Sequence, residues 1–250
     1  MHPEIQIGDF VIKSYVLFNF VLSTAVSFGV MLWLSYALFK EKAKLWKIAV
    51  LMIGGFISAV AIARLSHYIV FHKMYDLLGL SVVNTTASGY ILFTALILNI
   101  PVIWVLSKLV GYSPLAVLDI AKAGNCFSIF IAKIGCFLDG CCIGTPTNLP
   151  WGVTFPGTTV AVHPVQLYES AYGLIAGIVF IYLLKKQKLP QGAVFLIFAS
   201  TYSLVRLVMF CLRATPIGAS YTEAAPFVFL ALGFGFIMWL TNRLKLSEKY

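Results

Sequence analysis

Seven apolar segments, each long enough to cross a bilayer as a helix, constrain the fold of this chain more than any other feature. They cover residues 14–39, 46–71, 88–107, 114–138, 165–184, 192–212 and 226–242. A spanning helix needs about 20 apolar residues, because each residue rises about 1.5 Å through a hydrocarbon layer about 30 Å thick. Hydrophobic residues make up 60% of the 250-residue chain and charged residues only 11%, which excludes an ordinary soluble domain. We therefore expect an all-α integral membrane protein with seven transmembrane helices.

The basic residues predict how the helices are oriented. Eleven of the 18 Lys and Arg lie in alternate connections, at Lys40, Lys42, Lys44, Lys47, Lys108, Lys185, Lys186, Lys188, Arg243, Lys245 and Lys249. Because positively charged loops tend to remain in the cytoplasm, we expect the N-terminus outside and the C-terminus in the cytoplasm. These loops also account for the net charge of +9, so no nucleic-acid partner is expected. The first apolar segment is too long for a cleavable signal peptide.

The chain contains no internal repeat and no low-complexity tract, so residues 1–250 are predicted to form a single domain. Its longest connection, residues 140–164, carries no charged residue and is rich in Gly, Pro, Thr and aromatic residues. We expect this loop on the periplasmic side, at the membrane interface, with Trp151 and Phe155 at the depth of the lipid headgroups. Two interpretations remain open, an uncharged lid over a lipid site and a plain interfacial loop.

Four cations lie inside the predicted spans, where a charge at the bilayer centre costs about 2.5 to 3.5 kcal/mol on insertion scales. They are Arg64, Lys122, Lys133 and Arg206. Lys122 follows Asp119 by three residues, so we expect an ion pair on one helix face and a structural role for Lys122.

Lys133 has no such acid on its own helix. At about 100° per residue, it belongs to a polar stripe that leads to the glycine-rich end of the span; the stripe consists of Lys122, Cys126, Ile129, Lys133, Cys136 and Gly140. Asp139 points to another side of the helix.

The sixth span carries a phenol and two guanidinium groups without an acid. Helical spacing places Tyr202, Arg206 and Arg213 on one face, and residues 192–213 contain no carboxylate. An excess of buried cations predicts an anion from outside, and a phospholipid headgroup is the anion that a membrane supplies. The forked guanidinium group suits phosphate. Alternatively the arginines extend to the interface, an interpretation that fits Arg213 at the helix end better than Arg206.

Two further clusters of polar residues lie near the predicted helix ends. Arg64 and His67 either line the same cavity or mark the outer end of the second span. The sequence HPVQLYES, residues 163–170, opens the fifth span and places Gln166, Tyr168 and Glu169 in its first turns. Glu169 is either the counter-charge of Arg206 or Lys133, or a helix cap.

The five cysteines are an odd number and do not form a disulfide framework. Cys136, Cys141 and Cys142 lie at the outer end of the fourth span. We consider a disulfide from Cys136 to Cys141 or Cys142, small packing thiols, and a reactive thiol activated by Lys133. A zinc site with His163 is a weaker alternative, because the spacing does not provide four clear ligands.

Six motifs together resemble one family of membrane enzymes. They are IKSY (12–15), ARLSHY (63–68), AKIGCFLDGCCIG (132–144), WGVTFP (151–156), HPVQLYES (163–170) and YSLVRLVMFCLR (202–213). These stretches resemble the prolipoprotein diacylglyceryl transferase family, seven-helix integral membrane enzymes that begin bacterial lipoprotein maturation. The resemblance places the residues Tyr15, Arg64, Tyr202, Arg206 and Arg213 on functional tyrosines and arginines of the family. The most specific parts are HPVQLYE and a frame of Gly135, Phe137, Gly140 and Gly144.

The chain also departs from the family pattern. Lys133 stands where the family signature has arginine, Cys136 and Asp139 replace its asparagines, and Cys141 and Phe210 replace two glutamates. The family's third helix opens with a His-Gly-Gly motif, whereas TTASGY, residues 85–90, contains no histidine. The chain therefore resembles a divergent member.

The resemblance implies transfer of the diacylglyceryl group of phosphatidylglycerol, or a related anionic phospholipid, to an acceptor thiol. A lipobox-containing preprolipoprotein in the bacterial plasma (inner) membrane is one candidate acceptor, and no metal or cofactor is expected. We expect Arg206 and Lys133 to stabilise the departing phosphate, and Tyr15 and Tyr202 to hold its oxygens. The other candidate residues are expected to bind the lipid; they are Arg64, Cys136, Asp139, Gly140, Gly144, His163, Gln166, Tyr168, Glu169 and Arg213.

The base is the missing part of this expected site. His67 and His163 are candidate substitutes for the family histidine, and a thiolate that forms spontaneously lessens the need for a base. The competing hypothesis is a non-catalytic phospholipid-binding or accessory protein that retains the fold. A channel or transporter is less favoured, because the cations do not form a continuous path.

Overall fold

The computed structural model describes residues 4–7, 10–70, 72–77, 92–187, 189–214, 232–233 and 237. Its contacts group the chain into two compact units. Unit 1 comprises Met1–Leu38 and Asp119–Tyr250, and unit 2 comprises Phe39–Leu118. The single domain expected over residues 1–250 stays a prediction.

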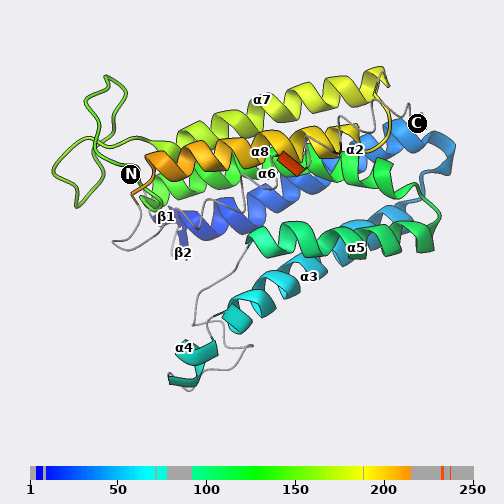
Figure 1. Cartoon of the computed structure of the whole chain (residues 1–250), viewed down its shortest axis with the longest axis horizontal. Helices are drawn as coiled ribbons and strands as arrows, with labels where there is room; N and C mark the ends of the chain where they lie inside the picture. Colours follow the sequence, from blue (N-terminus) through cyan, green and yellow to red (C-terminus); the bar gives the residue numbers. More distant parts are fainter. Residues whose placement is uncertain are drawn as a thin grey trace. The chain divides into compact units, whose positions relative to one another are not determined.

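The described elements are almost all helical (Figure 1). In chain order they are β1 (Glu4–Ile7), β2 (Phe10–Lys13), α1 (Ser14–Val16), the π-helical turn η1 (Leu17–Leu22), α2 (Ser23–Phe39), the 3₁₀ turn η2 (Lys40–Lys42), α3 (Leu45–Val70), α4 (His72–Leu77), α5 (Leu92–Val110), α6 (Pro114–Asp139), α7 (Val165–Lys186) and α8 (Ala193–Leu212).

Within the part of the chain that the structure describes, five helical segments are long and apolar enough to cross a membrane. They are Ser14–Lys42, Leu45–Ile69, Pro114–Asp139, Val165–Lys186 and Ala193–Leu212. These segments confirm the first, second, fourth, fifth and sixth predicted spans, so the chain is an all-helical, multi-pass protein in its apolar part. The third predicted span, 88–107, overlaps α5, and the seventh, 226–242, lies almost entirely outside the described residues. Seven spans and the orientation of the termini stay predictions.

A short hairpin precedes the first span and is a small addition to the all-α fold. β1 and β2 pair antiparallel, with Glu4 opposite Lys13 and Ile7 opposite Phe10. Strands of four residues each are too short to show a clear alternating pattern, so the apolar periodicity did not predict them.

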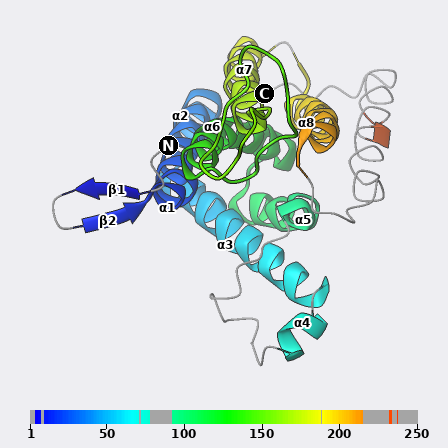
Figure 2. The ribbon, with the colours of Figure 1, turned by 90° about the vertical axis from the view of Figure 1, so that its left-hand side faces the viewer.

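In unit 1, α7 and α8 both lie along α6 (Figure 1, Figure 2). Two glycines one turn apart allow α7 to approach α6 closely. A Cβ at Gly173 would lie 2.6 Å from the carbonyl oxygen of Cys126, and a Cβ at Gly177 would lie 2.7 Å from the ring of Phe127. Small residues at this spacing are typical of helix pairs in membranes, where close van der Waals contact drives association.

The N-terminus of α8 is held by Asp119 of α6 rather than by a cap of its own. The buried Asp119 carboxylate accepts hydrogen bonds from the backbone N–H groups of Gly192 and Phe195, each at 2.7 Å. The expected pair of Asp119 with Lys122 is wrong: the two ion pairs among the described residues involve other cations. The Lys122 ammonium lies over the rings of Phe195 and Phe198 instead. Unsatisfied N–H groups at a helix start compete strongly for a carboxylate.

In unit 2, α3 and α5 pack at two adjacent glycines of α3, Gly54 and Gly55. A Cβ at Gly55 would lie 2.6 Å from Ile103, and Asn99 of α5 donates to the Gly55 carbonyl at 3.0 Å. Ser58 donates to the Asn99 side chain at 2.6 Å. Hydrogen bonds between small polar side chains of this kind stabilise helix pairs in an apolar environment.

Candidate functional site

Two cations converge on one buried carboxylate in unit 1. Lys133 Nζ of α6 lies 2.8 Å from Glu169 Oε2, and Arg206 Nη1 of α8 lies 3.0 Å from Glu169 Oε1. The Glu169 side chain on α7 is 3% exposed, so each of three helices contributes one residue. The structure confirms the prediction that Glu169 is a counter-charge of these cations. It lies beyond the first turn of α7 and is not a cap.

Among these three groups, here called the ion triad, two positive charges share one negative charge. Lys133 and Arg206 therefore point toward each other. Tyr202, one turn before Arg206, interacts electrostatically with all three groups and stacks on Tyr172 and Phe198 at centroid distances of 5.8 and 5.3 Å. A guanidinium, an ammonium and a phenol at one place are donors that suit a phosphate.

The end of α6 folds so that two thiols face each other. Gly140 has φ +76° and its N–H donates to Phe137 O, while the Cys141 N–H donates to Cys136 O at 3.1 Å. This pair of hydrogen bonds is the Schellman ending of a helix, which requires a residue in the left-handed region. It brings the side chains of Cys136 and Cys141 together. Glycine takes that conformation without strain. Asp139, the last helical residue, is partly buried beside this turn.

Cys142 completes a cluster of three free thiols, here called the thiol cluster: Cys136, Cys141 and Cys142. Arg213 Nη2 donates to Cys142 Sγ at 2.9 Å. Hydrogen bonds from the thiols of Cys136 and Cys141, reinforced by the Arg213 charge, hold the pKa of Cys142 well below the usual range of a thiol. Hydrogen bonds to Cys136 and Cys142 raise the pKa of Cys141. The disulfide considered from the sequence is not formed in this structure, and the described residues contain no group of three or more possible ligands placed to hold a metal ion.

Arg213 does not share a helix face with Tyr202 and Arg206, as the spacing predicted. α8 ends at Leu212, and Arg213 has an extended backbone that forms an antiparallel bridge with Gly144. Thr145 N–H donates to Leu212 O at 2.8 Å, next to this bridge. The backbone pairing ends the helix and turns the guanidinium toward Cys142.

Gly144 lies where three chain segments meet. Its N–H donates to His163 O, and a Cβ at this position would contact the His163 carbonyl and lie 3.0 Å from Leu212 O. Only a residue without a side chain permits this approach. Gly144 therefore joins the loop after α6 to the start of α7 and the end of α8.

The connection 140–164 is a folded loop. The backbone groups of Val153 and Val162 exchange two hydrogen bonds of 3.0 Å, and Trp151 Nε1 donates to the Tyr168 hydroxyl at 2.9 Å. Trp151 is 56% exposed, whereas Phe155 is 3% exposed and packs against Phe137. The loop buries the Phe155 ring in its own core, so this ring does not contact lipid headgroups directly, and its depth in the membrane stays a prediction.

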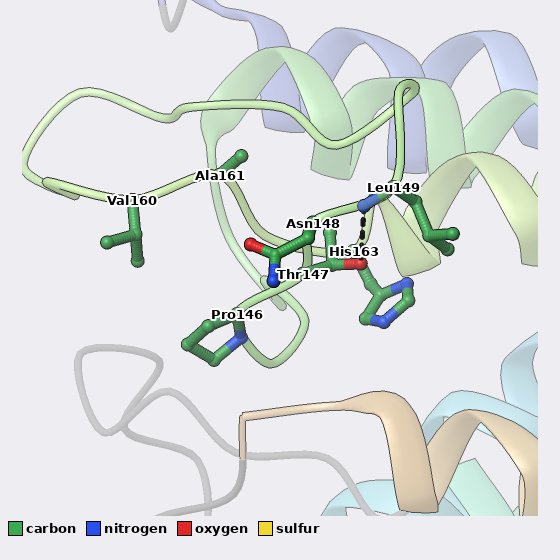
Figure 3. Close-up of a pocket in the computed structure, with 7 residues that line it drawn as sticks. All are labelled: Pro146, Thr147, Asn148, Leu149, Val160, Ala161 and His163. Atoms are coloured by element: carbon green, nitrogen blue, oxygen red, sulfur yellow. Dashed lines mark hydrogen bonds between the residues drawn. The ribbon is translucent and has the colours of Figure 1, made fainter.

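A hollow of about 750 Å³ opens on this loop (Figure 3). It is lined by Pro146, Thr147, Asn148, Leu149, Val160, Ala161 and His163. The Leu149 N–H donates to the Thr147 hydroxyl across its rim at 3.2 Å. No residue of the ion triad lines this hollow. His163 also places Nδ1 3.4 Å from the Tyr168 hydroxyl.

Two buried side-chain amides lie near the thiol cluster. In each of them, one polar atom has no hydrogen-bond partner among the described residues. Gln166 donates to Cys141 O at 2.5 Å, but its Oε1 is unpaired. Asn19, which the sequence analysis missed, accepts from the Cys136 thiol at 3.8 Å, but its Nδ2 is unpaired. Asn19 lies in the π-helical turn η1, against Gly135 of α6. An asparagine in an otherwise apolar span was the available signal.

Tyr15 and the unit 2 residues complete the predicted set. Tyr15, 38% exposed, lies within electrostatic range of the thiol cluster and Asp139. In unit 2, Arg64 lies over the Tyr75 ring at 5.5 Å, and His67 Nδ1 is 3.0 Å from the Tyr75 hydroxyl. The stretch TTASGY, 85–90, lies outside the described residues.

One family profile matches nearly the whole chain, and known proteins match parts of it. The prolipoprotein diacylglyceryl transferase family profile covers residues 4–240. Proteins named phosphatidylglycerol--prolipoprotein diacylglyceryl transferase are similar to this chain in several bacteria. The Acaryochloris marina protein is 30% identical over 82% of this chain and 77% of its own length, and the Finegoldia magna protein is 26% identical over 67% of each.

The Clostridium tetani protein of the same name is 28% identical over 55% of this chain and 57% of its own length. The chain therefore spans little more than half the length of the Clostridium tetani protein. The family profile, however, extends from the N-terminal hairpin beyond α8. The chain belongs to the prolipoprotein diacylglyceryl transferase family.

Proposed function

We propose that this protein transfers the diacylglyceryl group of phosphatidylglycerol, or a related anionic phospholipid, to the thiol of an acceptor such as a lipobox-containing preprolipoprotein. In this reaction the acceptor sulfur forms a bond to the glyceryl carbon and the bond from that carbon to the phosphate oxygen breaks. Glycerol phosphate leaves with the electron pair, and the thiol proton passes to solvent or a nearby base. The convergence of Lys133 and Arg206 on Glu169 is the observation that carries the proposal.

The ion triad supplies positive charge where the leaving group develops negative charge. Its three groups sum to one positive charge, and the Arg206 and Lys133 side chains are 25% and 17% exposed, so both are partly shielded from water. Preorganised cations in such a place stabilise a departing phosphate more effectively than they would in water. Lys133 contributes a point charge in place of the forked grip of an arginine.

Polar groups around the triad fit the rest of a lipid headgroup. Tyr202 and Tyr15 each offer a hydroxyl. The unpaired Asn19 Nδ2 and Gln166 Oε1 offer one donor and one acceptor. A buried polar atom without a partner costs about 1 to 3 kcal/mol, and a hydroxyl-bearing headgroup would relieve that cost.

The remaining predicted residues have supporting roles in this proposal. Gly140 and Gly144 shape the turn after α6, while His163 and Tyr168 join the folded loop to α7. Cys136 belongs to the thiol cluster, Asp139 lies next to it at the end of α6, and Arg213 donates to Cys142. Arg64 lies over the Tyr75 ring in unit 2. We expect the site to face the periplasmic side of the bacterial inner membrane.

The test is release of glycerol phosphate by the purified protein in nanodiscs that contain labelled phosphatidylglycerol, with a lipobox peptide as acceptor. We expect Arg206→Ala to abolish release and Arg206→Lys to retain part of it. Lys186→Ala, which removes an exposed lysine from the last turn of α7, is the matched control and is expected to be fully active. Lipid that stays bound without turnover in the wild-type protein would establish the accessory lipid-binding function instead.

A further inference from the structure

The thiol cluster has a composition that diacylglyceryl transfer does not require. It places two thiols and a third sulfur with a bound guanidinium at one helix end. Cys136 is 7% exposed, whereas Cys141 and Cys142 are only partly buried, so small reagents reach the outer part of the cluster.

The backbone around the cluster holds it in place. The Schellman ending of α6 brings Cys136 and Cys141 together. Cys142 follows with φ +61°, a left-handed conformation that a residue with a side chain seldom takes. Such a conformation persists only where neighbouring contacts fix it, and the bridge between Gly144 and Arg213 supplies one.

Cations from several elements lie near Cys142. They are Lys133 of α6, Arg206 of α8 and Arg213. The other titratable groups that act electrostatically with Cys142 are Cys136, Cys141 and Tyr15 of α1. Arg213 makes direct contact, because its N–H lies against the sulfur. A charge-assisted hydrogen bond to sulfur favours the thiolate, which is the nucleophilic form of cysteine.

We propose that Cys142 is a thiolate that hydroperoxides oxidise and that Cys136 or Cys141 then resolves, so that the end of α6 carries a reversible oxidation site. In the first step the Cys142 sulfur attacks the peroxide, the O–O bond breaks, and sulfenic acid and an alkoxide or hydroxide form. In the second step a neighbouring thiol attacks that sulfur, a disulfide forms and water leaves. Sulfur is oxidised and the hydroperoxide is reduced, so no other co-reactant is needed.

Ordinary packing thiols would not show this arrangement. Cys126 is buried within α6 and has no guanidinium contact among its described neighbours. The exposed Cys211 of α8 lies outside the cluster. Cys142 alone combines a cation, partial access and adjacent resolving thiols among the described cysteines. These are the three conditions that make a cysteine selectively oxidisable.

The first experiment measures alkylation of the reduced, full-length protein by iodoacetamide from pH 5.5 to pH 8, with each cysteine followed by peptide mass spectrometry. We expect the rate at Cys142 to be independent of pH. A thiol that is still protonated in this range reacts about tenfold faster for each added pH unit. Arg213→Gln is expected to slow labelling of Cys142 at pH 6, and Arg213→Lys to slow it less. Cys211 in the same molecule provides the reference rate.

The second experiment treats the protein with one equivalent of hydrogen peroxide in the buffer or of cumene hydroperoxide in the micelle, which separates an aqueous from a lipid source. We expect either reagent to produce a disulfide from Cys142 to Cys136 or Cys141 that dithiothreitol reverses. Cys142→Ser should abolish the disulfide, and Cys211→Ser should leave it unchanged.

Two results would overturn the proposal, and neither depends on transferase activity. One is alkylation of wild-type Cys142 that rises with pH as steeply as that of Cys211. The other is wild-type protein in which neither hydroperoxide produces a disulfide within the cluster. Because both are measured on the wild-type chain, a variant that fails to fold cannot hide them.

Discussion

At the scale of single residues, Glu169 determines whether two buried cations are tolerated. Glu169→Gln keeps the shape of the side chain but removes the charge that Lys133 and Arg206 share. Removing one partner from a buried ion pair typically costs about 3 to 5 kcal/mol, because the remaining charge stays desolvated. We expect the loss of unfolding free energy to lie at the lower end of this range, about 3 kcal/mol, because Lys133 and Arg206 are 17% and 25% exposed. The measurement is thermal unfolding in detergent, where the variant should melt at a lower temperature.

The matched control is Glu41→Gln, which neutralises an exposed acid in the turn after α2. It should leave the melting temperature unchanged. Replacing one cation as well, in the double variant Glu169→Gln with Lys133→Met, should recover part of the loss. If Glu169→Gln melts like the control, the ion triad does not stabilise the helices and the argument for a shared carboxylate fails.

Sequence reasoning at this scale identified the charged residues better than their partners. Lys133, Glu169 and Arg206 were recognised because an ionisable residue in an apolar span stands out. The predicted partner of Asp119 and the predicted helix face of Arg213 were wrong, because both positions are set by backbone groups of a distant segment. Side-chain spacing along one helix carries no information about such groups.

At the scale of elements, Asp119 secures the start of α8 from α6. Its two oxygens each accept one backbone N–H at 2.7 Å. Asp119→Asn leaves one acceptor oxygen and turns an NH₂ group toward an N–H donor, so one buried donor loses its partner. We expect a loss of about 1 to 3 kcal/mol in unfolding free energy, measured by thermal unfolding. Asp76→Asn, at an exposed position of α4, should have no effect, and an equal change in both variants would contradict the capping role.

The contact between α6 and α7 gives a second prediction for elements. A Cβ at Gly173 would meet backbone atoms of α6, 2.6 Å from Cys126 O and 2.8 Å from Phe130 N. Backbone cannot move aside as a side chain can, so Gly173→Ala should force the helices apart and cost about 1 to 3 kcal/mol.

Gly29→Ala is the control for this substitution. Gly29 lies inside α2, with nothing within 4 Å of its Cβ position, so alanine there should be neutral or stabilise the helix by up to about 1 kcal/mol. The melting temperatures of the two variants separate two effects of the added methyl group. Gly173→Ala reports steric crowding between helices, and Gly29→Ala reports helix propensity alone. Equal melting temperatures would show that α6 and α7 are not in close contact at Gly173.

The helices themselves were the easiest elements to predict. The apolar segments fixed α3, α6, α7 and α8 to within a few residues, because the length of a span follows from the thickness of the bilayer. The hairpin β1–β2 was missed, since strands this short have no distinctive pattern. The roles of Gly173 and Gly177 were also missed, because a glycine inside a span indicates a close contact without identifying the partner helix.

At the scale of the whole molecule, the chain must cross the membrane so that the thiol cluster and the loop 140–164 share one side. The basic residues in alternate connections predict that this side is the periplasm and that the C-terminus is cytoplasmic. A loop without any charged residue is consistent with that orientation, because positively charged loops are retained in the cytoplasm.

Fusion reporters test this orientation. Alkaline phosphatase inserted after Gly157, at an exposed turn with nothing within 4 Å of the Cβ position, should be active, because the enzyme folds only in the oxidising periplasm. Green fluorescent protein fused after Tyr250 should fluoresce from the cytoplasm. Phosphatase activity at Tyr250 together with none at Gly157 would show that the protein has the opposite orientation in the membrane. It would place the ion triad and Cys142 next to the reducing cytoplasm, where neither an exported acceptor nor a lasting disulfide is expected.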